Sequence, residues 1–282
     1  MRLAFHCERS NFVRPFPERA RRWRPADVPE PPPLRAAKGL KLRRFTIPAP
    51  AEELRGRRIA FLSDLHYHGS AAEERRIDAL ADELTAGRVD LLLLGGDITG
   101  DACDLPGMIR ALRRLAKCAP RALAVPGNWE RGKHWLGVDF WRDIYAQGGV
   151  ELLCNEYRRA GGFGVYGEDD LIHGVPEPPS RLPADGASRI LLTHRPDAVI
   201  ADDDGRLNTF FLALCGHTHG GQWRLPGWGA LYVPSLYGRR FDRGWFRGDG
   251  PGPRMFVSVG AGELSLRGRF NCPREAAVIE LA

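Results

Sequence analysis

Five short segments of this chain carry carboxylate, carboxamide or imidazole groups directly after an apolar run. Carboxylate and amide oxygens together with imidazole nitrogens suit Mn, Fe or Zn. Seven such groups are too many for one ion but suit two, so the pattern predicts a centre of two divalent metal ions rather than a nucleophile–base triad. The seven residues are Asp64, His66, Asp97, Asn128, His194, His217 and His219.

The apolar runs before these segments have the length of buried β-strands, and helical patterns separate them. The expected strands are 58–63, 89–94, 121–125, 189–193, 209–215 and 254–259. Expected helices include one with Ile77, Leu80, Ala81 and Leu84 on one face, and others over 106–118 and 134–147. This is an α/β pattern with largely parallel early strands. Because ligands bind at the carboxyl ends of such strands, the polar groups are expected to converge.

Each motif alone is a weak signal. An Asp-x-His or His-x-His at a strand end is most often ordinary polarity, and Cys215 with His217 and His219 could be half of a zinc site whose other half is not visible. Five such elements in order have no comparable structural explanation. Asp97 is the natural bridge, since a carboxylate can give one oxygen to each ion.

As a set, D-L-H, G-G-D, G-N-W-E, T-H-R-P-D and G-H-T-H-G-G-Q resemble the calcineurin-like metallophosphoesterase superfamily over residues 58–282. The resemblance implies a four-layer αββα sandwich and attack on phosphorus by a metal-bridging hydroxide. It implies that one ion is held by Asp64, His66, Asp97 and His219, and the other by Asp97, Asn128, His194 and His217. Asp97, Asn128 and His194 are the residues we expect to be catalytic.

Trp129 departs from the superfamily pattern, in which a His often follows the Gly-Asn and assists the leaving group. A missing general acid costs about 10²- to 10⁴-fold in rate for a poor leaving group and little for a phosphate or phenolate. One hypothesis is therefore a preference for pyrophosphates or activated diesters. The alternative is that Trp129 packs a wall of the site while another group, His68 or His134, supplies the proton.

Residues 222–247 combine aromatic and arginine side chains in a Gly-rich segment. Arg239 and Arg240, with Trp129, are the candidate substrate contacts, because arginine pairs with phosphate; the alternative is a solvated loop packed by its own aromatics. Motifs such as P-S-L-Y-G-R-R-F resemble a bacterial membrane-associated branch with relatives that cleave UDP-2,3-diacylglucosamine. A nucleotide-linked lipid precursor is thus a candidate substrate.

The basic charge is concentrated at the N-terminus. Residues 1–58 hold 15 basic and 6 acidic side chains, net +9, whereas the remainder holds 26 and 29, net −3. We expect an Arg/Pro-rich extension over 1–57 and a catalytic domain over 58–282. Phe12, Phe16 and Trp23 lie among arginines, so the extension could contact anionic membrane or wrap on the domain.

Cysteine spacing and the lack of a signal-peptide core predict a cytoplasmic protein, with the inner face of the membrane as the place of any lipid contact. The same residues leave two alternative functions open. A catalytically weak scaffold for protein binding is disfavoured because every expected ligand is present. A nuclease-type phosphodiesterase fits two-metal chemistry, but the net-acidic body argues against a nucleic-acid partner.

Overall fold

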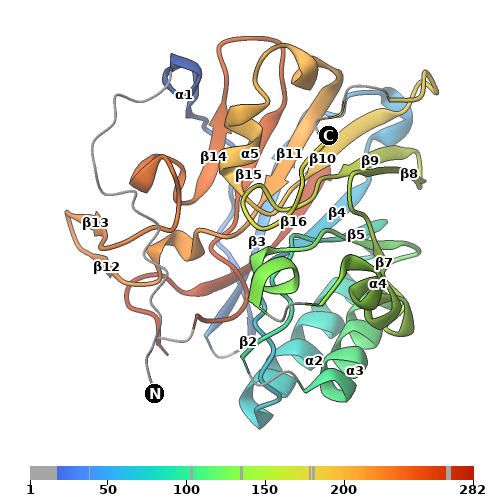
Figure 1. Cartoon of the computed structure of the whole chain (residues 1–282), viewed down its shortest axis with the longest axis vertical. Coiled ribbons are helices and arrows are strands. Elements are labelled where there is room, and N and C mark those ends of the chain that lie inside the picture. Colours follow the sequence, from blue (N-terminus) through green and yellow to red (C-terminus); the bar gives the residue numbers. More distant parts are fainter. Residues whose placement is uncertain are drawn as a thin grey trace.

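Two seven-stranded β-sheets form the centre of the computed structural model (Figure 1), which describes residues 18–37, 39–101, 104–133, 136–177, 179, 182–264 and 268–282. The first sheet has the order β2 (Leu34–Ala37), β3 (Leu40–Ile47), β16 (Arg274–Leu281), β4 (Arg58–Leu62), β5 (Leu91–Leu94), β6 (Ala122–Ala124) and β7 (Glu151–Leu152). The second has the order β1 (Arg24–Pro25), β14 (Gly244–Arg247), β15 (Arg254–Val257), β11 (Phe210–Cys215), β10 (Ser188–Leu192), β9 (Phe163–Gly167) and β8 (Glu156–Ala160). A small hairpin of β12 (Arg224–Leu225) and β13 (Gly229–Ala230) stands apart from both sheets.

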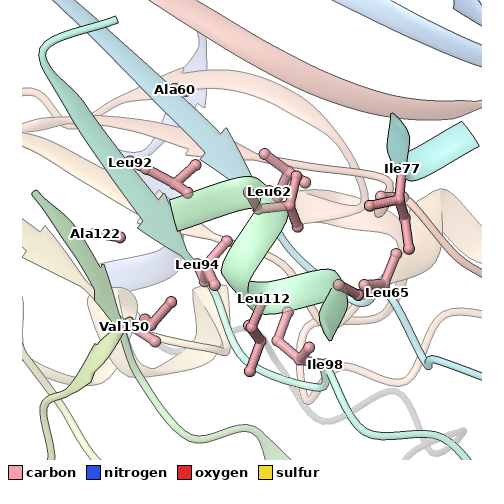
Figure 2. Packing of buried hydrophobic residues seen from close by; sticks show 14 of the residues in the cluster. Ala60, Leu62, Leu65, Ile77, Leu92, Leu94, Ile98, Leu112, Ala122 and Val150 are labelled. Atoms are coloured by element: carbon pink, nitrogen blue, oxygen red, sulfur yellow. The ribbon is translucent and has the colours of Figure 1, made fainter. Parts of the chain in front are cut away.

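Three apolar cores separate four layers, as the family resemblance implies. Figure 2 shows the outer core of the first sheet, where Leu62 and Leu94 lie near Leu112 of α3 (Leu105–Ala116). This core also holds side chains of α2 (Ala71–Ala86) and α4 (Val138–Gln147). A second core lies between the sheets. A third joins the second sheet to α1 (Glu18–Arg22) and α5 (Pro196–Ala201).

Helix α2 follows from local chemistry. The Ser70 hydroxyl accepts the backbone N–H of Glu73 at 3.2 Å, which satisfies one of the free donors at the helix start. Ile77, Leu80 and Leu84 then fall on the buried face. The helix ends at Ala86, before Gly87, which is the expected stop.

Parallel pairing aligns the strand ends that matter for function. Strands β4, β5 and β6 pair in parallel in the first sheet, and β10, β11 and β15 pair in parallel in the second. These six are the strands expected from the apolar runs. Their carboxyl ends therefore meet where the two sheets approach one another.

Residues before 58 contribute to both sheets. Strand β3 pairs with β16 along eight residues, and β1 pairs with β14. Trp23, which the sequence placed among candidate lipid contacts, is 2% exposed and donates its indole N–H to Asp203 at 2.8 Å. The described part of the N-terminal segment is thus wrapped on the domain, whereas residues 1–17, with Phe12 and Phe16, lie outside the described residues. No described helix is both long and apolar enough to cross a bilayer.

Candidate metal centre

All seven predicted ligands converge at the strand ends. Their buried carboxylate and imidazole groups form two sets of three, Asp64 with His66 and His219, and Asp97 with His194 and His217; within each set the ligand atoms lie within 4.8 Å of one another. The amide oxygen of Asn128 lies 3.0 Å from His194 Nε2, which adds it to the second set.

Asp97 lies between the two sets. Its Oδ2 is 3.7 Å from His66 Nε2 and 3.4 Å from His194 Nε2. On the other side of the first set, His219 Nε2 is 3.4 Å from Asp64 Oδ1. Asp97 is therefore the carboxylate whose position suits a bridge between two ions.

The donor set fits divalent cations. Imidazole nitrogens face one another at 3.0 Å between His66 and His219, and at 3.1 Å between His217 and His194. Burial raises the pKa of Asp64 to about 7 and lowers the pKa of His66 to about 4. For His194, burial lowers the pKa, but the neighbouring carboxylates of Asp97, Asp64 and Asp170 together outweigh it and raise the pKa to about 10. Buried carboxylates beside converging imidazoles are the surroundings that a divalent cation stabilises.

The backbone at the centre is strained in a way that serves this convergence. Five of the six residues in the two sets have positive φ, between 44° and 69°, which is uncommon outside glycine. Each such residue costs about 1 kcal/mol or more and persists only where surrounding structure holds it. The five are Asp64, His66, Asp97, His217 and His219.

Two glycines make room for the carboxylates. A Cβ at Gly216 would lie 1.7 Å from Ser63 Oγ and 2.3 Å from Asp64 Oδ2. A Cβ at Gly127 would lie 2.2 Å from Asp97 Oδ1. The two positions require glycine because the chain passes directly against the side chains that would hold the ions.

Glu130 organises the centre and was not singled out from the sequence. Its buried carboxylate accepts the backbone N–H of Asp97 at 3.0 Å, Ile98 at 2.9 Å and Gly127 at 2.9 Å. It also accepts the hydroxyl of Tyr145 at 3.0 Å. One side chain therefore fixes the loop after β5 to the loop after β6. The only signal in the sequence was an acidic residue two places after Asn128.

Two arginines contact the outer nitrogens of the histidines after β11. Arg195 is 2.8 Å from His217 Nε2 and pairs with Asp170 at 2.8 Å. Arg269 is 3.1 Å from His219 Nδ1 and donates to the carbonyl oxygen of Val259 at 2.7 Å. These contacts fix the positions of the two rings; because a guanidinium only donates, the contacted ring nitrogens accept. Neither arginine was predicted from the sequence to be part of the site.

Trp129 lies at the centre but is 7% exposed. Its ring packs against the ring of His66, and its backbone N–H donates to Asp97 Oδ1 at 2.8 Å. The alternative proton donor His68 lies after the first ligand loop, where its backbone N–H donates to Glu73 at 2.9 Å. His134 lies outside the described residues.

The two predicted substrate arginines both donate to backbone carbonyls. Arg239 donates to Trp228 at 3.0 Å and to Ala230 at 3.3 Å. Arg240 donates to Ala20 at 3.1 Å and to Trp23 at 2.9 Å. These bonds hold the chain between β12 and β14 in place, and substrate contact by either arginine stays a prediction.

Comparison with known proteins finds sequences related to this chain. The profile of the calcineurin-like phosphoesterase family matches residues 57–221, which is more than half of the chain. The chain is 32% identical to "Phosphodiesterase YaeI" of Escherichia coli over 79% of this chain and 82% of that protein. It is also 32% identical to "Uncharacterized metallophosphoesterase YkuE" of Bacillus subtilis, over 65% and 66%. A solved Thermus thermophilus sulfate thiohydrolase, SoxB, aligns over 80% of this chain and 56% of its own, with 16% identity and a TM-score of 0.44.

Proposed function

The chain belongs to the calcineurin-like phosphoesterase family and is a metal-dependent phosphoester hydrolase; from this premise we propose that it cleaves a phosphodiester or pyrophosphate bond at a two-metal centre. The observation that carries the proposal is the convergence of all seven predicted donors from five strand ends. A scaffold without catalysis would not require that convergence.

The proposed ligands are assigned to the two ions according to the two sets of side chains in the structure. Asp64, His66 and His219 would hold one ion, Asn128, His194 and His217 would hold the other, and Asp97 is placed to serve both. When bound, two divalent ions supply Lewis-acid stabilisation of phosphoryl oxygens and lower the pKa of a water molecule. Manganese, iron and zinc all suit this mixed oxygen and nitrogen donor set.

The protein's own residues fix where the reacting group sits. Glu130 and the backbone N–H of Trp129 hold Asp97 in one orientation, so the position of the bridge is set before substrate binds. The indole of Trp129 has no acidic proton to give. We infer that substrates whose leaving group departs without protonation, such as a nucleotide or an aryl oxide, react fastest.

Substrate identity is proposed at the level of leaving-group chemistry. The printed name of the E. coli relative supports a phosphodiester. The resemblance to the diacylglucosamine branch supports a nucleotide-linked lipid such as UDP-2,3-diacylglucosamine, in which the leaving group is UMP. Arg239 and Arg240 are the proposed contacts of a second phosphate, and the N-terminal segment over residues 1–58 is the proposed peripheral contact with an anionic membrane.

The decisive experiment is a substrate panel on metal-loaded protein, with Asp97→Asn as the inactive control. The panel contains a bis-aryl phosphate, UDP-2,3-diacylglucosamine, another nucleoside diphosphate-sugar, a cyclic nucleotide, single-stranded DNA and an alkyl monoester. We expect aryl diester or pyrophosphate cleavage that the control lacks. Alkyl monoester as the fastest substrate would refute the leaving-group inference, and cleavage of DNA alone would favour a nuclease.

A further inference from the structure

An exposed apolar patch surrounds the β12–β13 hairpin. Of the nine large hydrophobic residues that are exposed in the described chain, seven belong to residues 223–236 or lie at Phe270. Trp228 at the hairpin turn is 70% exposed, and Leu231 and Leu236 are 57% and 55% exposed. The hairpin patch comprises Trp223, Leu225, Trp228, Leu231, Tyr232, Leu236 and Phe270. Such a concentration marks an interaction surface rather than scattered exposure.

The hairpin is held in shape from beneath, so the exposure is not that of an unstructured loop. Arg239 donates to the carbonyls of Trp228 and Ala230, and Trp223 stacks on Phe270 with 6.3 Å between ring centroids. Figure 1 shows β12 and β13 projecting from the side of the molecule, away from both sheets. The patch is therefore a preformed protrusion with its most exposed ring at the turn.

The charge around the patch is strongly positive. Residues 223–247 contain five arginines and a single acidic residue, Asp242. Asp242 pairs with Arg224. Arg243 is exposed, Arg239 donates to backbone carbonyls, and neither forms an ion pair with a described residue. An apolar turn with Trp and Tyr, backed by arginines, is the composition of a segment that enters an anionic lipid interface.

We propose that the hairpin patch docks on the surface of an anionic lipid bilayer. The positive charge favours an anionic bilayer over a second copy of the chain as the binding partner. In a symmetric dimer the arginines around the two patches would face one another and repel. An anionic bilayer instead offers apolar chains to Trp228 and Leu231 and phosphates to Arg243.

The patch is connected directly to the metal centre. Arg224 follows His219 by five positions, and its guanidinium donates to the carbonyl of Gly220. A Cβ at Gly221 would lie 2.4 Å from Ala230 Cβ, so the hairpin packs on the ligand loop itself. Docking would therefore hold the centre close to the lipid surface. The inference concerns this surface alone and does not depend on which substrate is cleaved.

Vesicle flotation tests the proposal without any activity assay. The probes are phosphatidylcholine vesicles with and without about one third phosphatidylglycerol, at low and high salt. We expect the full chain to bind the anionic vesicles, more weakly at high salt. Trp228→Ser with Leu231→Ser should weaken binding at least about tenfold. Arg243→Glu should weaken it in the anionic vesicles only.

Matched controls separate the patch from general stickiness and from misfolding. Val175 is 71% exposed and lies outside the patch, so Val175→Ser is the control for removing exposed apolar side chains. Arg55 is another exposed arginine, so Arg55→Glu is the control for the charge reversal at Arg243. Both controls should bind vesicles as the wild type does, and all variants should keep the wild-type melting temperature. The proposal is overturned if the wild type does not bind anionic vesicles, or if the Trp228→Ser/Leu231→Ser variant binds them as tightly as the wild type does. It is also overturned if the protein does not bind vesicles and sedimentation shows that it dimerises through the patch.

Discussion

The indole ring of Trp129 lies edge-on to the imidazole of His66, with 4.5 Å between ring centroids and 67° between ring planes. The same residue donates its backbone N–H to the bridging candidate Asp97. Trp129 thus supports two proposed ligands at once, one through its ring and one through its backbone. This packing explains why Trp129 is buried, whether the site lacks a general acid or another group supplies the proton. The two hypotheses predict different effects of a substitution at Trp129.

Replacing Trp129 with His tests whether the site lacks a general acid. If it does, Trp129→His should raise the hydrolysis rate of an alkyl monoester by about tenfold or more and leave an aryl diester nearly unchanged. Trp129→Phe is the control, since it keeps a ring against His66 without an ionisable proton. Steady-state kinetics on both esters measure the effect. No gain with His would mean that another group supplies the proton.

Replacing Glu130 with Gln should loosen the centre without touching a proposed ligand. The amide cannot accept all the N–H groups that the carboxylate accepts from Asp97, Ile98 and Gly127. We expect the free energy of unfolding to fall by about 3 kcal/mol and metal affinity to fall about 10- to 100-fold. Urea unfolding and metal titration measure the two quantities.

Tyr145→Phe is the matched control for Glu130, because it removes one of the donors to the same carboxylate. A loss of about 1 kcal/mol is expected there. Equal losses in both variants would show that the backbone bonds to Glu130 contribute little.

Gly216→Ala should displace Asp64. The added Cβ would meet Ser63 Oγ at 1.7 Å and Asp64 Oδ2 at 2.3 Å, so one of these side chains must move. We expect metal affinity to fall at least about tenfold, together with lower stability. Gly137→Ala is the control, since a Cβ there meets nothing within 4 Å. Calorimetric metal titration of both variants decides, and unchanged affinity in Gly216→Ala would remove the close-approach argument.

The sequence predicted the strand ends well because their signals are local. Asp64, Asp97 and Asn128 each follow an apolar run, so both the strand and the convergence could be inferred from neighbouring residues. The pairing of β3 with β16 joins residues more than 200 positions apart, which no local pattern records. Glu130 was missed for a related reason, since its partners are backbone N–H groups brought to it only by the fold. Trp23 was placed among lipid contacts because composition does not show which aromatic ring is buried.

Asp197 should make the stability of the protein depend on pH. Asp197 lies in α5 and is 1% exposed. Its Oδ1 accepts the backbone N–H of Leu236 at 2.6 Å and the hydroxyl of Ser235 at 3.1 Å. Its Oδ2 has no hydrogen-bond partner among the described residues. Burial raises the pKa of Asp197 from 3.8 to about 6, although these donors oppose the shift. Because the folded pKa is the higher one, its stabilising contribution is complete below pH 3.8 and is lost as the pH rises through 6.

Asp197→Asn isolates this contribution, since the amide stays neutral at every pH. Between pH 5 and pH 7.5 the wild type should lose about 1 kcal/mol of unfolding free energy relative to the variant, with most of the change below pH 6.5. Urea unfolding of both proteins at several pH values measures the difference, in which the titration of all other groups cancels. A wild-type minus variant difference that stays constant over this range would show that Asp197 is already ionised in the folded protein at pH 5.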